Sequence, residues 1–168
     1  MILNNIDNYR YDKYEKKVRA ILIDEDNYIY VTHMNTSITF PGGTVENSEN
    51  IEESIAREIK EEVGITNLKF KYLGSLIFYH EKFPNLKEKP ISFSTRVNEI
   101  HYFYSKINSK DIGVQDLTDF ERESKLKIEK HKLSDLINKL NEENNDLYAK
   151  FMKEETLAAI DLYQSIDL

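Results

Sequence analysis

Residues 43–65 read GTVENSENIEESIAREIKEEVGI, and this stretch decides the interpretation of the whole chain. Its middle part, residues 50–63, is rich in helix formers, and Gly64 follows as a C-terminal stop. Apolar residues recur there at every fourth position: Ile51, Ile55, Ile59 and Val63. This spacing predicts an amphipathic helix over residues 50–63.

The same stretch concentrates the negative charge of the protein. The chain has 168 residues and a formal net charge of minus 7, and residues 44–65 alone hold seven Glu against Arg57 and Lys60. Only about two of the net negative charges therefore lie elsewhere. A solvated helix face is the simplest explanation of a Glu-rich helix, but the angular positions of two of these residues argue against it.

On a helical wheel that starts at Ile51, Glu58 and Glu62 fall within about 20° of that position. The predicted buried stripe runs from Ile51 to Ala56 at about 140°, so the two carboxylates stack at its border. Partly buried like charges need compensation, and a divalent cation supplies it most simply. Clustered carboxylate oxygens suit Mg²⁺ or Mn²⁺, which keep free positions for phosphate oxygens.

Elements on either side of the helix indicate one mixed α/β (α+β) domain over residues 1–168. Residues 18–23 and 28–32 read as a hairpin, and the segment 38–40 ends at Pro41-Gly42-Gly43. Residues 1–16 read as a polar N-terminal arm, and 81–90 as a loop. Further strands are expected at 68–72, 75–79, 100–107 and 126–131, and helices at 133–140 and 146–166.

Composition excludes several classes of protein. Net acidity opposes binding to a nucleic-acid polymer, and no apolar run is long enough to span a membrane. The absence of Cys excludes disulfides and thiolate metal sites, and the first residues lack the apolar run of a signal peptide. We therefore expect a cytoplasmic protein without a membrane partner.

A known motif coincides with the helix. The residues at its nine specified positions are Gly43, Glu49, Arg57, Glu58, Ile59, Glu61, Glu62, Gly64 and Ile65. This arrangement resembles the Nudix box, G-x5-E-x7-R-E-U-x-E-E-x-G-U, at all nine positions. The preceding Phe40-Pro41-Gly42 fits the family's usual entry to the box, and the order of strands resembles the Nudix fold, an α/β/α sandwich around a mixed β-sheet.

The resemblance implies an activity and a set of site residues. Nudix enzymes use Mg²⁺ or Mn²⁺ to hydrolyse a pyrophosphate link in a nucleoside diphosphate joined to another group. By this resemblance Glu58 and Glu62 are principal metal ligands, and Glu61 is a ligand or orients water. The carbonyl of Gly42 or Gly43 is a backbone ligand, and Glu49 and Arg57 form the structural ion pair of the box.

The general base stays open at this point. Glu58 is one candidate, and because the base of some family members lies outside the box, a loop acid after the strand at 100–107 competes. Glu123 is the first choice among these loop acids and Glu121 the second. Solvated loop charge is the alternative explanation of both.

The substrate is not readable from marks that follow the box. Residue 81 is Glu and residue 83 is Phe, so the Pro or Tyr of known subgroups is absent. Lys17, Arg19 and Arg96 could contact phosphate, but nothing in the sequence distinguishes them from surface charge. Five strand aromatics could stack on a base, although core packing is expected for most: Phe78, Tyr79, Phe83, Tyr102 and Tyr104.

The leading hypothesis is a pyrophosphohydrolase of a small nucleotide, such as an ordinary or oxidised nucleoside triphosphate cleaved to monophosphate and pyrophosphate. One alternative is a nucleotide-sugar or dinucleoside polyphosphate pyrophosphatase. Another is a non-catalytic nucleotide-binding module, which we would expect to have lost box carboxylates. A homodimer stays open, because the apolar stripe at 147, 151, 158, 162 and 166 could cover the sheet or pair with a second subunit.

Overall fold

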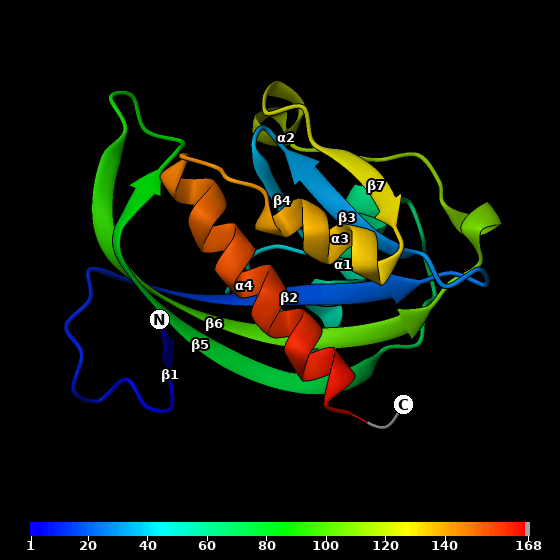
Figure 1. The fold of residues 1–168 in the computed structure, drawn as a ribbon, viewed down its shortest axis with the longest axis horizontal. Coiled ribbons are helices and arrows are strands. Elements are labelled where there is room, and N and C mark those ends of the chain that lie inside the picture. The colour runs from blue at the N-terminus through cyan, green and yellow to red at the C-terminus, as the bar shows by residue number, and fades with distance from the viewer. Residues whose placement is uncertain (167–168) are drawn as a thin grey trace.

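A mixed sheet is the framework of the computed structural model, which describes residues 1–166 (Figure 1). Within these residues it has seven strands: β1 (Ile2–Leu3), β2 (Lys13–Ile23), β3 (Ile29–Met34), β4 (Ser37–Thr39), β5 (Lys71–Asn85), β6 (Ser92–Lys106) and β7 (Lys127–His131). The helices are α1 (Ile51–Val63), the 3₁₀ turn η1 (Ser109–Asp111), α2 (Asp119–Glu123), α3 (Leu133–Asn141) and α4 (Leu147–Gln164). This architecture confirms the mixed α+β fold class.

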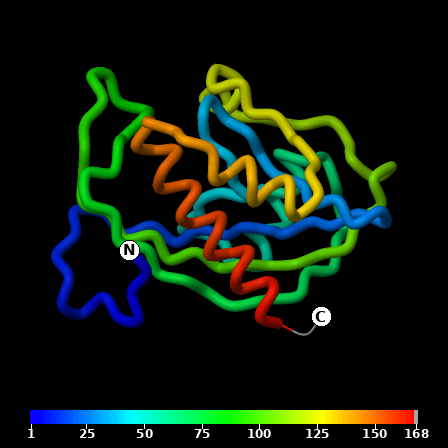
Figure 2. The backbone as a smooth tube through the Cα atoms, viewed as in Figure 1, coloured from blue at the N-terminus to red at the C-terminus, as the bar shows by residue number. Residues whose placement is uncertain are grey.

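The strands run in the order β1-β5-β6-β2-β3-β4, with β7 paired to β3. The central pair, β2 and β6, is parallel and stays in register from Lys13 opposite Arg96 to Ile23 opposite Lys106. Helix α1 lies behind the sheet, and α3 and α4 cross its front face (Figures 1 and 2). Alternation along β2 therefore sends Ala20 toward α1 and Ile21 toward α4, in two separate apolar clusters.

Helix α1 forms where the sequence predicts it. Asn50 caps its N-terminus through a reciprocal pair of bonds with Glu53, and Gly64 ends it in the left-handed conformation. The predicted stripe is wrong at one residue, because Ala56 is exposed and Ser54 is buried instead. The buried face is rotated toward Glu58 and Glu62, both of which are themselves buried.

The N-terminal arm is more ordered than expected. Residues Ile2–Leu3 pair with β5, and β2 begins at Lys13 rather than at residue 18. The added part of β2 is polar, and its backbone pairs with β6, where one ion pair also joins the two strands. Glu15 lies 3.2 Å from the Arg96 guanidinium of β6 and 3.4 Å from Lys17 Nζ.

Strand β5 is longer and more continuous than the sequence predicts. The strands expected at 68–72 and 75–79 are one strand that continues to Asn85, and most of the expected loop at 81–90 belongs to that strand or to the turn before β6. The register shifts at Gly74, with φ of 142°, and again near Lys82, with φ of 54°. These bulges interrupt the alternation from which strands are recognised in a sequence.

The C-terminal elements lie close to their expected positions, but α4 buries a different face. Asp146 caps α4, and the buried residues are Ala149, Met152, Glu155, Thr156, Ala159 and Ile160. Of the expected stripe, Leu147 is 39% exposed and residues 151, 158 and 162 are only partly buried. Among residues 1–166, no helix has the length and apolarity needed to cross a lipid bilayer.

Candidate active site

The glycine loop of the site runs beside β2 as if it were a further strand. The amide of Ala20 donates to the Pro41 carbonyl at 2.9 Å, and the amide of Val18 donates to the Gly43 carbonyl at 3.0 Å. Gly42 has φ of 135°, and a β-carbon there would lie 2.2 Å from the Val18 carbonyl oxygen. Only glycine therefore lets the loop approach β2 so closely.

Two buried carboxylates of α1 face this loop. Glu62 is 3% exposed, and its Oε2 accepts a 2.7 Å hydrogen bond from the Gly42 amide. Glu58 lies so close to Gly43 that a β-carbon on that glycine would come within 2.3 Å of Oε1. Burial raises the pKa of Glu58, and it raises that of Glu62 to about 8.

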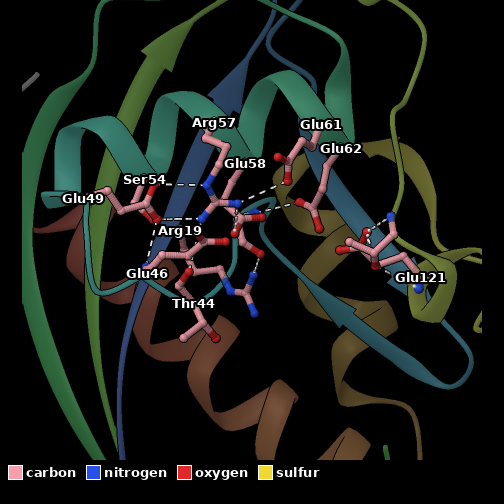
Figure 3. Close-up of polar contacts among 12 residues, drawn as sticks. Arg19, Thr44, Glu46, Glu49, Ser54, Arg57, Glu58, Glu61, Glu62 and Glu121 are labelled. Carbon is pink, nitrogen blue, oxygen red and sulfur yellow. Dashed lines mark hydrogen bonds and ion pairs between the residues drawn. The ribbon is translucent and has the colours of Figure 1, made fainter.

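Arg57 connects the loop to the carboxylates (Figure 3). Its Nε and Nη2 donate to the two oxygens of Glu49 at 3.0 and 2.7 Å. Nη1 donates to Glu58 at 2.9 Å and to Glu61 at 3.2 Å. The bidentate bond from Arg57 lowers the pKa of Glu49 to about 2. The ion pair that the resemblance implies is therefore present, and it also orients two acids of α1.

The donor chemistry of this place fits a divalent cation. Carboxylates of Glu58, Glu61 and Glu62 and the glycine carbonyls are hard oxygen donors, and two of the acids are buried without an equal number of counter-charges. Within residues 1–166, no three acidic or His side chains are placed to coordinate one metal ion together. Arg57 holds Glu58 and Glu61, while the Gly42 amide holds Glu62.

The carboxylates open into a cleft of about 780 Å³. Its walls come from the glycine loop, α1, the middle of β2, strands β3 and β4, the turn before β6, α2 and the start of α4. A second hollow, of about 650 Å³, lies between the β3–β4 turn and the α3–α4 connection. None of the nine box positions lines it, so the first cleft is the candidate active site.

The two loop acids differ in position. Glu121 lines the cleft, whereas Glu123 is exposed and lies outside the residues that line it. Thr118 donates to Glu121 Oε2 from its amide at 2.7 Å and from its hydroxyl at 2.8 Å, which fixes the carboxyl at the N-terminus of α2. The geometry thus favours Glu121 over Glu123, the reverse of the order expected from sequence.

The aromatics of the cleft are not those considered from the sequence. Phe78, Phe83 and Tyr102 are almost fully buried in the core, as expected for strand aromatics. Phe120 and Tyr148 line the cleft instead. Both belong to first turns of helices, where no periodic pattern marks them, so only the tertiary arrangement reveals them.

Three cations also line the cleft without belonging to the box: Lys17, Arg19 and Lys87. Arg19 donates from Nη1 to the Gly42 carbonyl, one of the two candidate backbone ligands (Figure 3). Arg96, the third cation considered for phosphate contact, is buried and does not line the cleft.

A model of the NUDIX domain matches residues 13–151 of the chain. The chain belongs to the Nudix family. This Nudix chain is 38% identical over 63 residues to the 8-oxo-dGTP diphosphatase of Escherichia coli strain K12, which covers 34% of the chain and 49% of that protein. It is 34% identical over 76 residues to the 8-oxo-dGTP diphosphatase of Buchnera aphidicola subsp. Schizaphis graminum. This match covers 42% of the chain and 58% of that protein. The Nudix chain thus spans about half the length of the curated relatives it matches.

A solved structure supports the same fold. The NUDIX domain of Shewanella oneidensis NrtR, solved with ADP ribose, aligns with a TM-score of 0.59 over 95% of this Nudix chain and 94% of that one. Its sequence identity is 13%, so the likeness concerns the fold alone. Nudix hydrolases generally need a divalent metal ion, in agreement with the oxygen donors of the cleft.

Proposed function

We propose that this Nudix protein hydrolyses nucleoside triphosphates, releasing a nucleoside monophosphate and pyrophosphate, with Mg²⁺ or Mn²⁺ as cofactor. One observation carries the proposal: Glu58 and Glu62 are buried side by side on α1, against a glycine loop at the edge of a large cleft. The names of the two curated relatives suggest an oxidised guanine nucleotide as one substrate.

In this proposal, Glu58, Glu61, Glu62 and the Gly42 or Gly43 carbonyl hold the cation. The cation, when bound, neutralises diphosphate charge during in-line substitution. Arg57 keeps Glu58 and Glu61 oriented between turnovers. A carboxylate then accepts the proton of the attacking water, and Glu121 and Glu58 are the candidates for that base.

The test is a panel of nucleotides incubated with and without Mg²⁺, including nucleoside triphosphates, oxidised guanine nucleotides, nucleotide sugars and dinucleoside polyphosphates. We expect metal-dependent release of a nucleoside monophosphate, reduced by several orders of magnitude in Glu58→Gln and Glu62→Gln. Glu52→Gln is the matched control, because this exposed glutamate lies on the same helix but does not line the cleft. Cooperative thermal melting of the wild type and of all three variants serves as the check that each of them is folded.

Two results would contradict the proposal. Unchanged turnover in both cleft variants would remove the metal site from these residues. Nucleotide binding without turnover of any panel member would indicate a binding module instead of a hydrolase.

A further inference from the structure

Two cations outside the box, Lys17 and Arg19, line the cleft from the same strand. Lys17 and Arg19 are two positions apart on β2, so their side chains leave the same face of the strand. Both line the cleft together with Glu58 and Glu62. Lys16, whose side chain leaves the opposite face of β2, is exposed and does not line the cleft.

Arg19 lines the cleft and has donors that no hydrogen bond of the described chain uses. A guanidinium has five N–H donors, and Arg19 uses Nη1 on the Gly42 carbonyl. Within residues 1–166 it makes no ion pair, although its charge opposes the burial effect on the pKa values of Glu58 and Glu62. By contrast, Arg57 donates to three carboxylates and is fully committed to the box.

Lys17 is similarly underused. It is 7% exposed, and its ammonium makes one ion pair within the described chain, with Glu15 at 3.4 Å. Burial lowers the pKa of Lys17, while Glu15 and the nearby Glu155 counter that effect. Burying a cation is costly, so a buried ammonium at the wall of a cleft is well placed to gain from an anionic ligand.

We propose that Lys17 and Arg19 form an anion subsite that binds the terminal phosphate of a nucleoside triphosphate. This inference rests on the proposed function of the same cleft and names the residues that select for a third phosphate. In this arrangement the box carboxylates bind the metal that contacts the diphosphate. Lys17 and Arg19 bind the third, terminal phosphate. A neutral sugar in that place would offer these cations no charge, so nucleotide sugars bind less tightly.

The test uses inorganic tripolyphosphate and pyrophosphate as probes, titrated calorimetrically into the full chain at saturating Mg²⁺. Neither probe has a base, so recognition of the nucleoside does not enter. We expect wild type to bind tripolyphosphate more tightly than pyrophosphate. Arg19→Gln and Lys17→Gln should each weaken tripolyphosphate binding by about tenfold, with a smaller loss for pyrophosphate.

Lys16→Gln is the matched control, since it removes the same charge from the next residue of the same strand. We expect a change of less than about twofold in this variant. Arg19→Lys retains the charge and should recover most of the tripolyphosphate affinity. Thermal melting checks the fold of each variant. If Lys17→Gln does not fold, Arg19→Gln alone tests the proposal, because Arg19 is only partly buried.

Wild-type affinity in folded Arg19→Gln would overturn the subsite. Equal losses for both probes would overturn it too, because Arg19 would then act through the Gly42 carbonyl and the metal loop. The subsite and the hydrolase proposal fail separately. If no nucleotide is hydrolysed but tripolyphosphate binding still depends on Arg19, only the hydrolase proposal falls.

Discussion

Two adjacent glycines illustrate how little space separates the box loop from its neighbours. At Gly42 an added β-carbon would meet the backbone of Val18, whereas at Gly43 it would meet the carboxylate of Glu58. A backbone atom cannot move without distorting β2, but the end of a glutamate side chain can rotate. The same substitution therefore has different effects at the two positions.

Gly43→Ala should leave the fold intact and weaken the metal site, because the new methyl group displaces the Glu58 carboxylate. We expect a loss of Mn²⁺ affinity of about tenfold or more, measured by electron paramagnetic resonance, with a nearly unchanged melting temperature.

Gly42→Ala is the contrasting variant. It forces φ of 135° on a residue with a β-carbon and pushes that atom into the Val18 carbonyl, so the melting temperature itself should fall. Equal stability losses in the two variants would contradict this distinction.

At the scale of elements, the ion pair between Glu49 and Arg57 joins the loop to α1. The pKa of Glu49 is about 2 in the folded chain, below its ordinary value of 4.5, because Arg57 donates two hydrogen bonds to it. A depressed pKa contributes stability that is fully present above pH 4.5. This contribution falls as the pH drops toward 2, where the folded chain also takes up the proton.

The prediction compares wild type with Glu49→Gln by urea unfolding between pH 7 and pH 2. Wild type should be more stable at pH 7, and the difference should shrink steadily below pH 4.5. Glu46→Gln is the control, since its side chain has no hydrogen bond or ion pair within residues 1–166. A difference between wild type and Glu49→Gln that does not change with pH would rule out the ion pair as its source.

The sequence predicts those elements whose pattern of buried residues reflects packing against one neighbouring surface. Helix α1 has a cap, a stop and one buried face, so its limits were predicted to within one residue. The sequence predicts two strands and a loop in place of β5, because the register shifts at Gly74 and near Lys82 depend on pairing with β6. The buried face of α4 was also wrong, because polar Glu155 and Thr156 point inward to partners that are distant in sequence.

The candidate site combines residues that the sequence locates with residues that only the fold brings together. The acids that we propose as metal ligands could be located from the sequence, because they lie on one predicted helix at fixed spacing. Lys17, Arg19, Phe120 and Tyr148 reach the cleft from β2, α2 and α4, which meet only in the folded chain. Their selection therefore required the tertiary structure.

Over the whole molecule, one buried carboxylate ties the C-terminal helix to the sheet. Glu155 of α4 is 3% exposed and accepts hydrogen bonds from His80 of β5 at 3.0 Å and from Asn98 of β6 at 2.8 Å. Burial opposes its ionisation, but His80 and Lys17 hold the pKa of Glu155 below its ordinary value. Polar contacts of Glu155 thus join the helix to the sheet inside an interface that also buries the apolar residues Met152, Ala159 and Ile160.

Glu155→Ala should cost about 3 kcal/mol in the free energy of unfolding, because it leaves His80 and Asn98 buried without their acceptor. The neighbouring Glu154→Ala should cost less than about 1 kcal/mol, since Glu154 is 38% exposed and pairs with the N-terminal amine. Urea unfolding measures both. Similar losses of unfolding free energy in the two variants would show that the buried contact of Glu155 stabilises the fold no more than the exposed ion pair of Glu154.

The parallel pairing of β2 with β6 also constrains how the protein folds. Residues Lys13–Ile23 can complete their ladder only after Arg96–Lys106 have left the ribosome, although every box residue has been synthesised long before. Pairing between such distant segments is slow, so refolding is expected on a scale of about milliseconds to seconds. A nascent chain that ends within the β5–β6 turn therefore has every acid of the box, but it lacks the strand that holds β2 and its two cations in place.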